Sequence, residues 1–193
     1  MAKLEIIVAS TRPNRIGPSI GQWMLTQATE HGAFTEVELV DLAEVNLPFM
    51  NEPHHPRLGR YVHQHTREWS AKVTEADAFV FVMPEYNFGY NAELKNAIDY
   101  LHAEWQYKPV GLVSYGGVSA GTRAAQMIKQ VVTTLKMTPV PEAVSIPFVH
   151  QLIDEDEGLQ PNEIMIASAK AMLEELARLS EALLPLRRPT TMP

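Results

Sequence analysis

The sequence predicts an α/β fold in which a five-stranded parallel sheet carries helices on both faces. Strand and helix patterns alternate five times along the 193 residues, without an internal repeat or a second-domain linker. Residues 78–83 and 110–113 are continuous apolar runs, typical of strands that are buried on both faces of a parallel sheet. Residues 34–40 alternate charged and apolar side chains, which indicates a strand at the sheet edge.

The first strand is expected at residues 3–9, and a polar loop follows at 10–18. The next segment has apolar residues at helical spacing and reaches Gly32, which suits a left-handed helix cap. Its inward residues are Ile20, Trp23, Met24 and Ala28. The second strand, residues 34–40, leads into an irregular proline-containing segment at 41–60.

A further helix precedes the buried strand, and the periodicity places Leu58, Tyr61, Val62, Trp69, Val73 and Ala76 on its inward face. Pro84 is expected to end the strand at 78–83. After a loop at 84–90, Asn91 is a suitable N-cap for a helix that buries Leu94, Ala97, Ile98 and Leu101. Lys95 and Asp99 are one turn apart on this helix and are expected to form a surface ion pair.

The strand at 110–113 is followed by a glycine-containing loop at 114–121. The next helix is marked by Ala124, Ile128, Val131 and Leu135, and the last strand by Val144 and Ile146. Pro161 suits the first turn of a final helix, which follows the acidic loop 154–157 and is expected to end at Pro185. Its apolar stripe, from Met165 to Leu183, is expected to be core, with any exposed part available for a subunit interface. Residues 1–186 are therefore predicted to form one domain, and 187–193 a disordered tail.

Composition excludes several classes of protein. With no cysteine, neither disulfides nor thiol chemistry is possible, and a cytoplasmic location is compatible with that. A net charge of −7 argues against a nucleic-acid partner. The apolar run at 4–9 is too short for a signal peptide, and no run approaches membrane-spanning length.

Five strands with an edge second strand suit the order 2-1-3-4-5, which is the flavodoxin-like order. The loops after strands one, three and four then meet at one edge of the sheet, where such folds bind ligands. The first of these loops carries Ser10, Thr11, Arg12 and Arg15 directly before a helix. Hydroxyls, guanidinium groups and a helix N-terminus together favour phosphate binding. The alternative is a solvated surface loop with an N-cap. Neither a Walker loop nor the GxGxxG fingerprint is present.

The other two loops suit a planar ring. Pro84, Tyr86, Phe88 and Tyr90 offer flat apolar faces, although they could also form a cluster that merely packs over the strand ends. The loop after strand four decides between these alternatives, because a backbone at Gly116 and Gly117 can approach a ligand closely. Phosphate at one loop and a ring between the other two describe flavin mononucleotide (FMN).

At this point a family resemblance is evident. Pro84-Glu85-Tyr86-Asn87 followed by Leu94-Lys95-Asn96-Ala97-Ile98-Asp99 resembles the signature of the NADPH-dependent FMN reductase family. Ser114-Tyr115-Gly116-Gly117, with Arg123 beyond it, resembles the family's second flavin loop, and Ser10-Thr11-Arg12 its phosphate loop. The resemblance implies a flavodoxin-like fold, bound FMN, reduction by NADPH or NADH, and a homodimer or homotetramer with the flavin near a subunit interface.

The residues and the resemblance together give one set of candidate FMN-binding residues. They are Ser10, Thr11, Arg12, Arg15, Ile16, Gly17, Pro84, Glu85, Tyr86, Asn87, Phe88, Ser114, Tyr115, Gly116 and Gly117. The backbone N–H groups of Gly116 and Gly117 are expected to stabilise negative charge on the ring, and no catalytic side chain is required. The segment Phe88-Gly89-Tyr90-Asn91 replaces the family's usual Gly-Ser-Ile-Pro, and Ala120 stands where a glycine pair is common. Both departures bear on acceptor specificity.

The expected function is an FMN-dependent NAD(P)H oxidoreductase that passes electrons to a quinone, an azo compound, a metal oxyanion or free flavin. The alternatives are a flavodoxin-type FMN electron carrier without nicotinamide turnover, and a binding protein on the same fold that has lost catalysis. Arg12 and Arg15 favour the enzyme, because flavodoxin phosphate loops resemble arginine-free turns. No metal site is expected, since the histidines between His54 and His65 lack a fixed ligand spacing. Glu85 is expected to structure its loop through a hydrogen bond.

Overall fold

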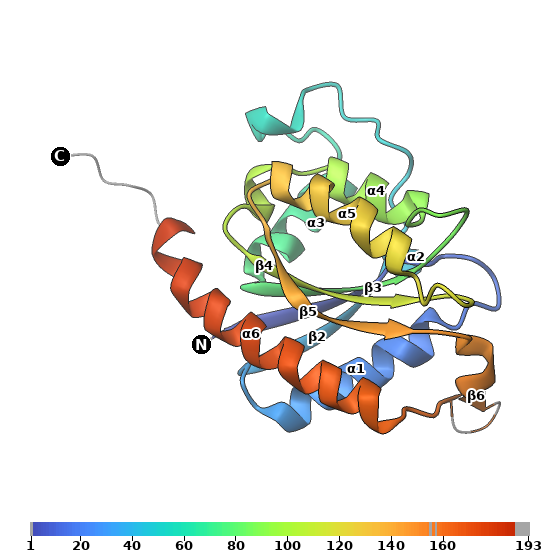
Figure 1. Ribbon diagram of the computed structural model, residues 1–193. Coiled ribbons are helices and arrows are strands. Elements are labelled where there is room, and N and C mark those ends of the chain that lie inside the picture. The colour runs from blue at the N-terminus through green and yellow to red at the C-terminus, as the bar shows by residue number, and fades with distance from the viewer. Residues whose placement is uncertain (1, 155, 157, 188–193) are drawn as a thin grey trace.

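The computed structural model describes residues 2–154, 156 and 158–187. Its main sheet has five parallel strands in the order β2-β1-β3-β4-β5, which confirms the predicted order (Figure 1). The strands are β1 (Lys3–Val8), β2 (Glu36–Asp41), β3 (Ala78–Pro84), β4 (Pro109–Tyr115) and β5 (Thr138–Ile146). All of β3 and β4 is buried, as their apolar runs predict.

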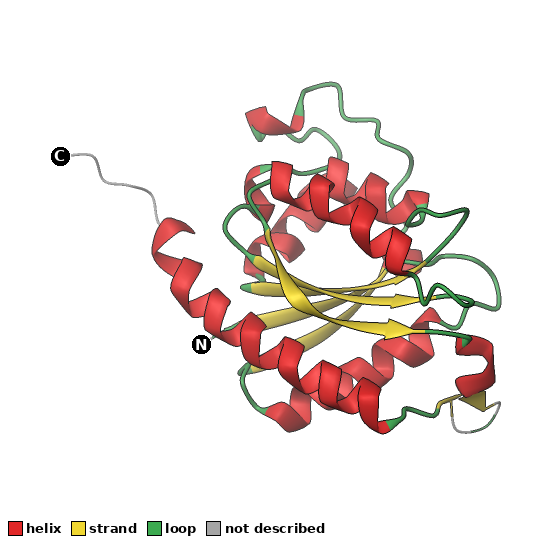
Figure 2. Ribbon diagram, in the orientation of Figure 1, coloured by secondary structure: helices red, strands yellow, loops and turns green. Residues whose placement is uncertain are grey.

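Helices cover both faces of the sheet. α1 and α6 lie against one face, and α3, α4 and α5 lie against the other (Figure 2). The helices are α1 (Gly17–His31), α2 (Leu42–Val45), α3 (Gln64–Glu75), α4 (Ala92–Asp99), α5 (Thr122–Thr134) and α6 (Glu163–Arg187). Short 3₁₀ turns occur at η1 (Pro56–Leu58), η2 (Ala103–Trp105) and η3 (Val149–Leu152), and β6 (Ile153–Asp154) pairs with β7 (Gly158–Leu159).

The sheet separates two apolar cores, because successive side chains of a strand point to opposite faces. Val80 of β3 faces the core under α1 and α6, whereas Phe79 and Phe81 face the core under α3, α4 and α5. In the second core the indole nitrogens of Trp69 and Trp105 donate to carbonyls of residues 97 and 98, at 2.9 and 3.1 Å. Both large side chains are therefore buried without an unsatisfied donor.

Some element boundaries differ from the sequence prediction. α3 begins only at Gln64, so Leu58, Tyr61 and Val62 are not on its inward face, and Leu58 and Val62 are exposed. Pro84 is the last residue of β3 and pairs with Tyr115, because proline at a strand end needs no ladder N–H. Lys95 and Asp99 do form the predicted ion pair, at 2.5 Å.

The final helix is the other correction. Its first residue is Glu163, so Pro161 precedes the helix, and Asn162 accepts the N–H of Met165 through its side chain. The helix continues past Pro185 to Arg187. Arg187 is not part of a tail, because its guanidinium contacts Asp77 at 2.7 Å. The rest of the predicted tail, 188–193, lies outside the described residues, as do positions 155 and 157 of the acidic loop.

Charged residues gather at the amino ends of β1 and β2. The Lys3 ammonium contacts Glu36, Glu38 and Glu75 at 2.8–3.1 Å, and hydrogen bonds to Glu38 and Glu36 raise the pKa of Lys3. Glu5, two residues further along β1, is completely buried, and neither of its carboxylate oxygens has a hydrogen-bond partner. Burial, with the charge of Glu38 beside it, raises the pKa of Glu5 to about 7.

Candidate functional site

A cavity of about 220 Å³ opens at the carboxyl edge of the sheet, where the loops after β1, β3 and β4 converge. We call it the three-loop cavity. Its lining residues are Ser10, Arg12, Arg15, Ile16, Pro84, Glu85, Tyr86, Tyr115, Gly116, Gly117, Val149 and His150. Ten of these twelve were predicted from the sequence. Of the other predicted residues, Thr11 lines a neighbouring cavity, Asn87 and Phe88 lie in the loop after β3, Gly17 begins α1, and Ser114 lies near the end of β4.

The two arginines of the loop after β1 differ in their contacts. Arg15 forms an ion pair with Asp41, at the end of β2. Among the residues that the structure describes, Arg12 has neither an ion pair nor a hydrogen bond, and it is exposed at the cavity. Helix α1 begins at Gly17, immediately beyond this loop, so its first unpaired N–H groups and the positive end of its dipole lie beside Arg12. This corner of the cavity is built for an anion.

Close packing fixes the start of α1. A Cβ built on Gly17 would lie 3.0 Å from the Tyr115 hydroxyl and 3.1 Å from a methyl group of Val8. Glycine at this position therefore lets the helix N-terminus approach the loop after β4. Burial raises the pKa of Tyr115, so its hydroxyl is neutral at physiological pH. Ser10 reaches across the cavity to the hydroxyl of Tyr86 at 3.0 Å, which joins the first and second loops.

The loop after β3 makes a strained two-residue hairpin turn. The N–H of Tyr86 donates to the Gly89 carbonyl at 2.8 Å, and the N–H of Gly89 donates back to Tyr86 at 2.9 Å. The two central residues, Asn87 and Phe88, have φ values of 50° and 71°, as a type I′ turn requires. Asparagine tolerates this conformation, but phenylalanine does so only at a cost. Phe88 is 67% exposed, and the Arg123 guanidinium stacks on its ring 3.9 Å from the centroid.

Glu85 joins the second loop to the third. One of its carboxylate oxygens accepts from Ser119 and from the Arg123 guanidinium, both at 2.8 Å. The other accepts the backbone N–H of Arg123 at 3.1 Å. The prediction that Glu85 structures its loop is therefore confirmed, and its charge is neutralised by Arg123. With both oxygens occupied, Glu85 is not placed to move a proton.

The loop after β4 corrects one expectation about the glycine pair. The N–H of Gly116 donates to the Ile146 carbonyl of β5 at 3.2 Å, so it is not available to a ligand. The N–H of Gly117 has no partner among the described residues. The turn is closed from below by Ser114, whose hydroxyl donates to the Ala120 carbonyl at 2.9 Å. Ala120 itself has a φ of 53°, a conformation that glycine adopts more easily.

Three contributors escaped the sequence prediction. Val149 and His150 line the cavity from the turn after β5, which is held by hydrogen bonds from Phe148 and Val149 to the carbonyls of Gly117 and Gly116. No local motif marks them, but the topology places this turn at the same edge as the other loops. Asn91 was predicted as an N-cap and does occupy the N-cap position of α4, and its buried side-chain amide donates to the Ala9 carbonyl at 2.7 Å. It thereby anchors the start of the first loop.

The histidines between His54 and His65 lie outside the three loops that form the cavity. The rings of His63 and His65 stack at 5.2 Å, and each hydrogen-bonds Asn51. Within residues 2–154, 156 and 158–187, no three histidine or acidic side chains are grouped so that they could hold a metal ion. Over the same residues, no helix is long and apolar enough to cross a membrane.

Comparison with known proteins places this geometry in a family. The model of the NADPH-dependent FMN reductase family matches residues 2–151. An NAD(P)H-dependent FMN reductase of Schizosaccharomyces pombe is 41% identical over 149 residues, covering 75% of this chain and 74% of that protein. An FMN-dependent NADPH-azoreductase of Staphylococcus saprophyticus is 28% identical over 141 residues, or 72% and 74% of the two chains. The solved structure of FerB, a flavoenzyme NAD(P)H:(acceptor) oxidoreductase of Paracoccus denitrificans, superposes with a TM-score of 0.71 at 19% identity, covering 94% and 98% of the two chains.

Proposed function

Because the chain belongs to the NADPH-dependent FMN reductase family, we propose that it is an FMN-dependent NAD(P)H oxidoreductase whose FMN occupies the three-loop cavity. The observation that carries this assignment is the unpaired Arg12 beside the N-terminus of α1, at one end of a cavity whose other end is formed by an aromatic and a glycine loop. When bound, FMN accepts hydride from NAD(P)H and passes the electrons to the second substrate.

The residues present fit this cofactor. Arg12 and the first N–H groups of α1 would hold the phosphate. The Tyr86 ring and the Pro84 backbone would frame one side of the flavin ring, and the free N–H of Gly117 would donate to its polar edge. Gly116 contributes close backbone approach only, since its N–H is bound to Ile146. Val149 and His150 would border the same cavity from the turn after β5.

The acceptor is proposed to be a small planar molecule, with a quinone or an azo compound as the leading candidates and free flavin or a metal oxyanion as the others. The azoreductase relative supports this class. Phe88, in the loop after β3, is exposed, and an aromatic ring with the Arg123 guanidinium stacked on it suits a flat, electron-poor guest.

The proposed assembly is a homodimer or a homotetramer. Apolar side chains lie exposed around the cavity mouth, and they belong to Tyr86, Phe88, Val118 and Phe148. A second subunit would cover them and exclude water from the flavin ring. Light scattering at micromolar concentration should return at least twice 21.6 kDa, and a mass of one chain would refute the assembly.

A visible spectrum tests the function directly. The purified protein should be yellow, and its flavin band should bleach under anaerobic NADH or NADPH. Colour that neither nucleotide bleaches would identify the flavodoxin-type carrier instead. A colourless protein that takes up no added FMN would remove the cofactor assignment.

A further inference from the structure

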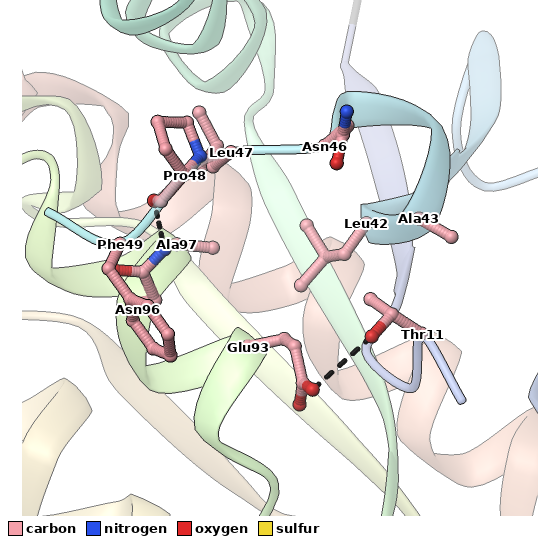
Figure 3. A pocket seen from close by; sticks show the side chains of 10 residues that line it. All are labelled: Thr11, Leu42, Ala43, Asn46, Leu47, Pro48, Phe49, Glu93, Asn96 and Ala97. Atoms are coloured by element: carbon pink, nitrogen blue, oxygen red, sulfur yellow. Dashed lines mark hydrogen bonds between the residues drawn. The ribbon is translucent and has the colours of Figure 1, made fainter.

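A second cavity, of about 500 Å³, lies next to the loop after β1 at Thr11 (Figure 3). It is bordered by α2, by the segment 46–49 and by the first two turns of α4, and we call it the side cavity. Thr11 lines the side cavity, whereas its neighbours Ser10 and Arg12 line the three-loop cavity. The loop after β1 therefore borders both cavities, and an elongated ligand that crosses this loop would reach both.

Hydrogen bonds hold the wall of the side cavity in place. The Asn96 amide donates to the Pro48 carbonyl at 2.7 Å and accepts the N–H of Met50 at 3.0 Å. The Tyr100 hydroxyl also hydrogen-bonds the Pro48 carbonyl, at 3.1 Å. These contacts fix the backbone on both sides of Phe49, although its ring is 84% exposed. An apolar ring is thus displayed at the cavity mouth on a rigid segment.

The opposite wall presents one oriented carboxylate. Glu93 accepts the Thr11 hydroxyl at 3.2 Å on one oxygen (Figure 3). Its other oxygen accepts the Asn91 amide at 2.7 Å. Each oxygen keeps a further lone pair for a ligand. The first turn of α4 stabilises this negative charge through the helix dipole. None of the residues that line the cavity is lysine or arginine.

We propose that the side cavity binds the adenosine half of the nicotinamide dinucleotide and that Glu93 selects NADH over NADPH. The base would pack against Phe49 and Pro48, and the ribose hydroxyls would donate to Glu93, as acidic residues do in other dinucleotide sites. In the FMN-loaded protein Arg12, which follows Thr11, is assigned to the FMN phosphate, so a 2′-phosphate would meet the carboxylate with no lining cation to offset it. This inference rests on the proposed function, because the nicotinamide end must reach FMN in the three-loop cavity.

Binding of nucleotide fragments to the FMN-loaded protein tests the site without turnover. Adenosine 5′-monophosphate should bind, and adenosine 2′,5′-bisphosphate should bind at least about tenfold more weakly. Phe49→Ala should weaken the monophosphate about tenfold, since stacking of a base on an aromatic ring has this magnitude. Leu58→Ala is the matched control, because Leu58 is also exposed and apolar in the same segment but does not line the cavity.

Glu93→Gln tests the selectivity. The wild-type ratio of kcat/KM for NADH over NADPH should be about tenfold or more, and Glu93→Gln should bring it close to one. Glu44→Gln removes a charge from the adjacent helix α2 outside the cavity and should leave the ratio unchanged. FMN content and far-UV circular dichroism of each variant report whether it is folded.

The failures can be told apart. If neither nucleotide reduces the bound FMN, the proposed function falls and this inference falls with it. If both reduce FMN with equal kcat/KM, or if Phe49→Ala and Glu93→Gln behave like their controls, only the adenosine site is refuted. Absence of monophosphate binding to the wild-type protein would refute it as well.

Discussion

The two edges of the sheet differ in how their charged residues are partnered and in whether their backbone is strained. At the amino edge, Lys3 contacts three carboxylates and Glu5 is sealed inside the core. At the carboxyl edge, Arg12 has no partner within the described residues, and Phe88 is held at positive φ with an exposed ring. Features of the second kind cost stability and are kept where a ligand uses them. The amino edge therefore governs how stable the fold is, and the carboxyl edge what it binds.

The largest expected effect belongs to Glu5. Its pKa is raised to about 7 in the folded protein, so the folded state holds a proton that the unfolded state loses near pH 4.5. The free energy of unfolding should therefore fall by about 2.5 kcal/mol as pH rises from 5 to 8. Chemical denaturation at several pH values measures this slope.

Glu5→Gln removes the titration but keeps the shape, so its unfolding free energy should change much less over the same pH range. Glu30→Gln, on the exposed surface of α1, should keep the wild-type slope. If the unfolding free energy of the two variants depends equally on pH, the titration of Glu5 does not cause the pH dependence of stability.

Next in size is the effect of Arg12 on FMN. Arg12→Ala should weaken FMN binding about ten- to hundredfold, because one charge-assisted phosphate contact contributes roughly 1.5–3 kcal/mol. Arg178→Ala is the control, since Arg178 is exposed on α6 and pairs only with Glu175. Quenching of flavin fluorescence on titration gives both affinities. If Arg12→Ala and Arg178→Ala bind FMN equally well, Arg12 does not contact the cofactor, and the proposed difference between the two sheet edges is wrong.

The smallest expected effect concerns backbone strain at Ala120, at the carboxyl edge of the sheet. Ala120→Gly should raise the unfolding free energy by roughly 0.5–1 kcal/mol, because the relief of strain at φ 53° exceeds the added entropy of the unfolded chain. The same change at Ala124, inside α5, should lower it by about 1 kcal/mol. If both changes lower the melting temperature, the backbone at Ala120 is not strained.

The sequence predicts the sheet well, because its information there is local. Continuous apolar runs identify β3 and β4, and the alternation of Glu36 and Glu38 identifies the edge strand β2. Most of the three-loop cavity follows from the strand order alone. Leu58 and Val62 were wrongly placed on the inward face of α3. Helical periodicity does not show where a helix begins, and α3 begins only at Gln64, after the proline-containing segment.

Contacts between loops were beyond the sequence. The bond from the Gly116 N–H to Ile146 depends on the register between β4 and β5, which includes an irregularity between residues 110 and 112. Thr11 lines a different cavity from its neighbours Ser10 and Arg12, which no local sequence pattern shows. The side cavity depends on Asn96 reaching a segment 48 residues away, which no local pattern encodes.

The position of α6 has a consequence for synthesis on the ribosome. Every residue of the three-loop cavity has been made once the chain reaches His150, but the core under α1 is closed by Met172 and Leu176 of α6. At about 5–20 residues per second, the nascent chain passes through an interval of a second or more with complete ligand loops and an open apolar face. Binding of FMN in that interval would require the loops to assemble on half a core. FMN is therefore expected to bind only after α6 has left the ribosome and packed onto the sheet. Until then, a chaperone would bind the exposed apolar surface on the α1 side of the sheet.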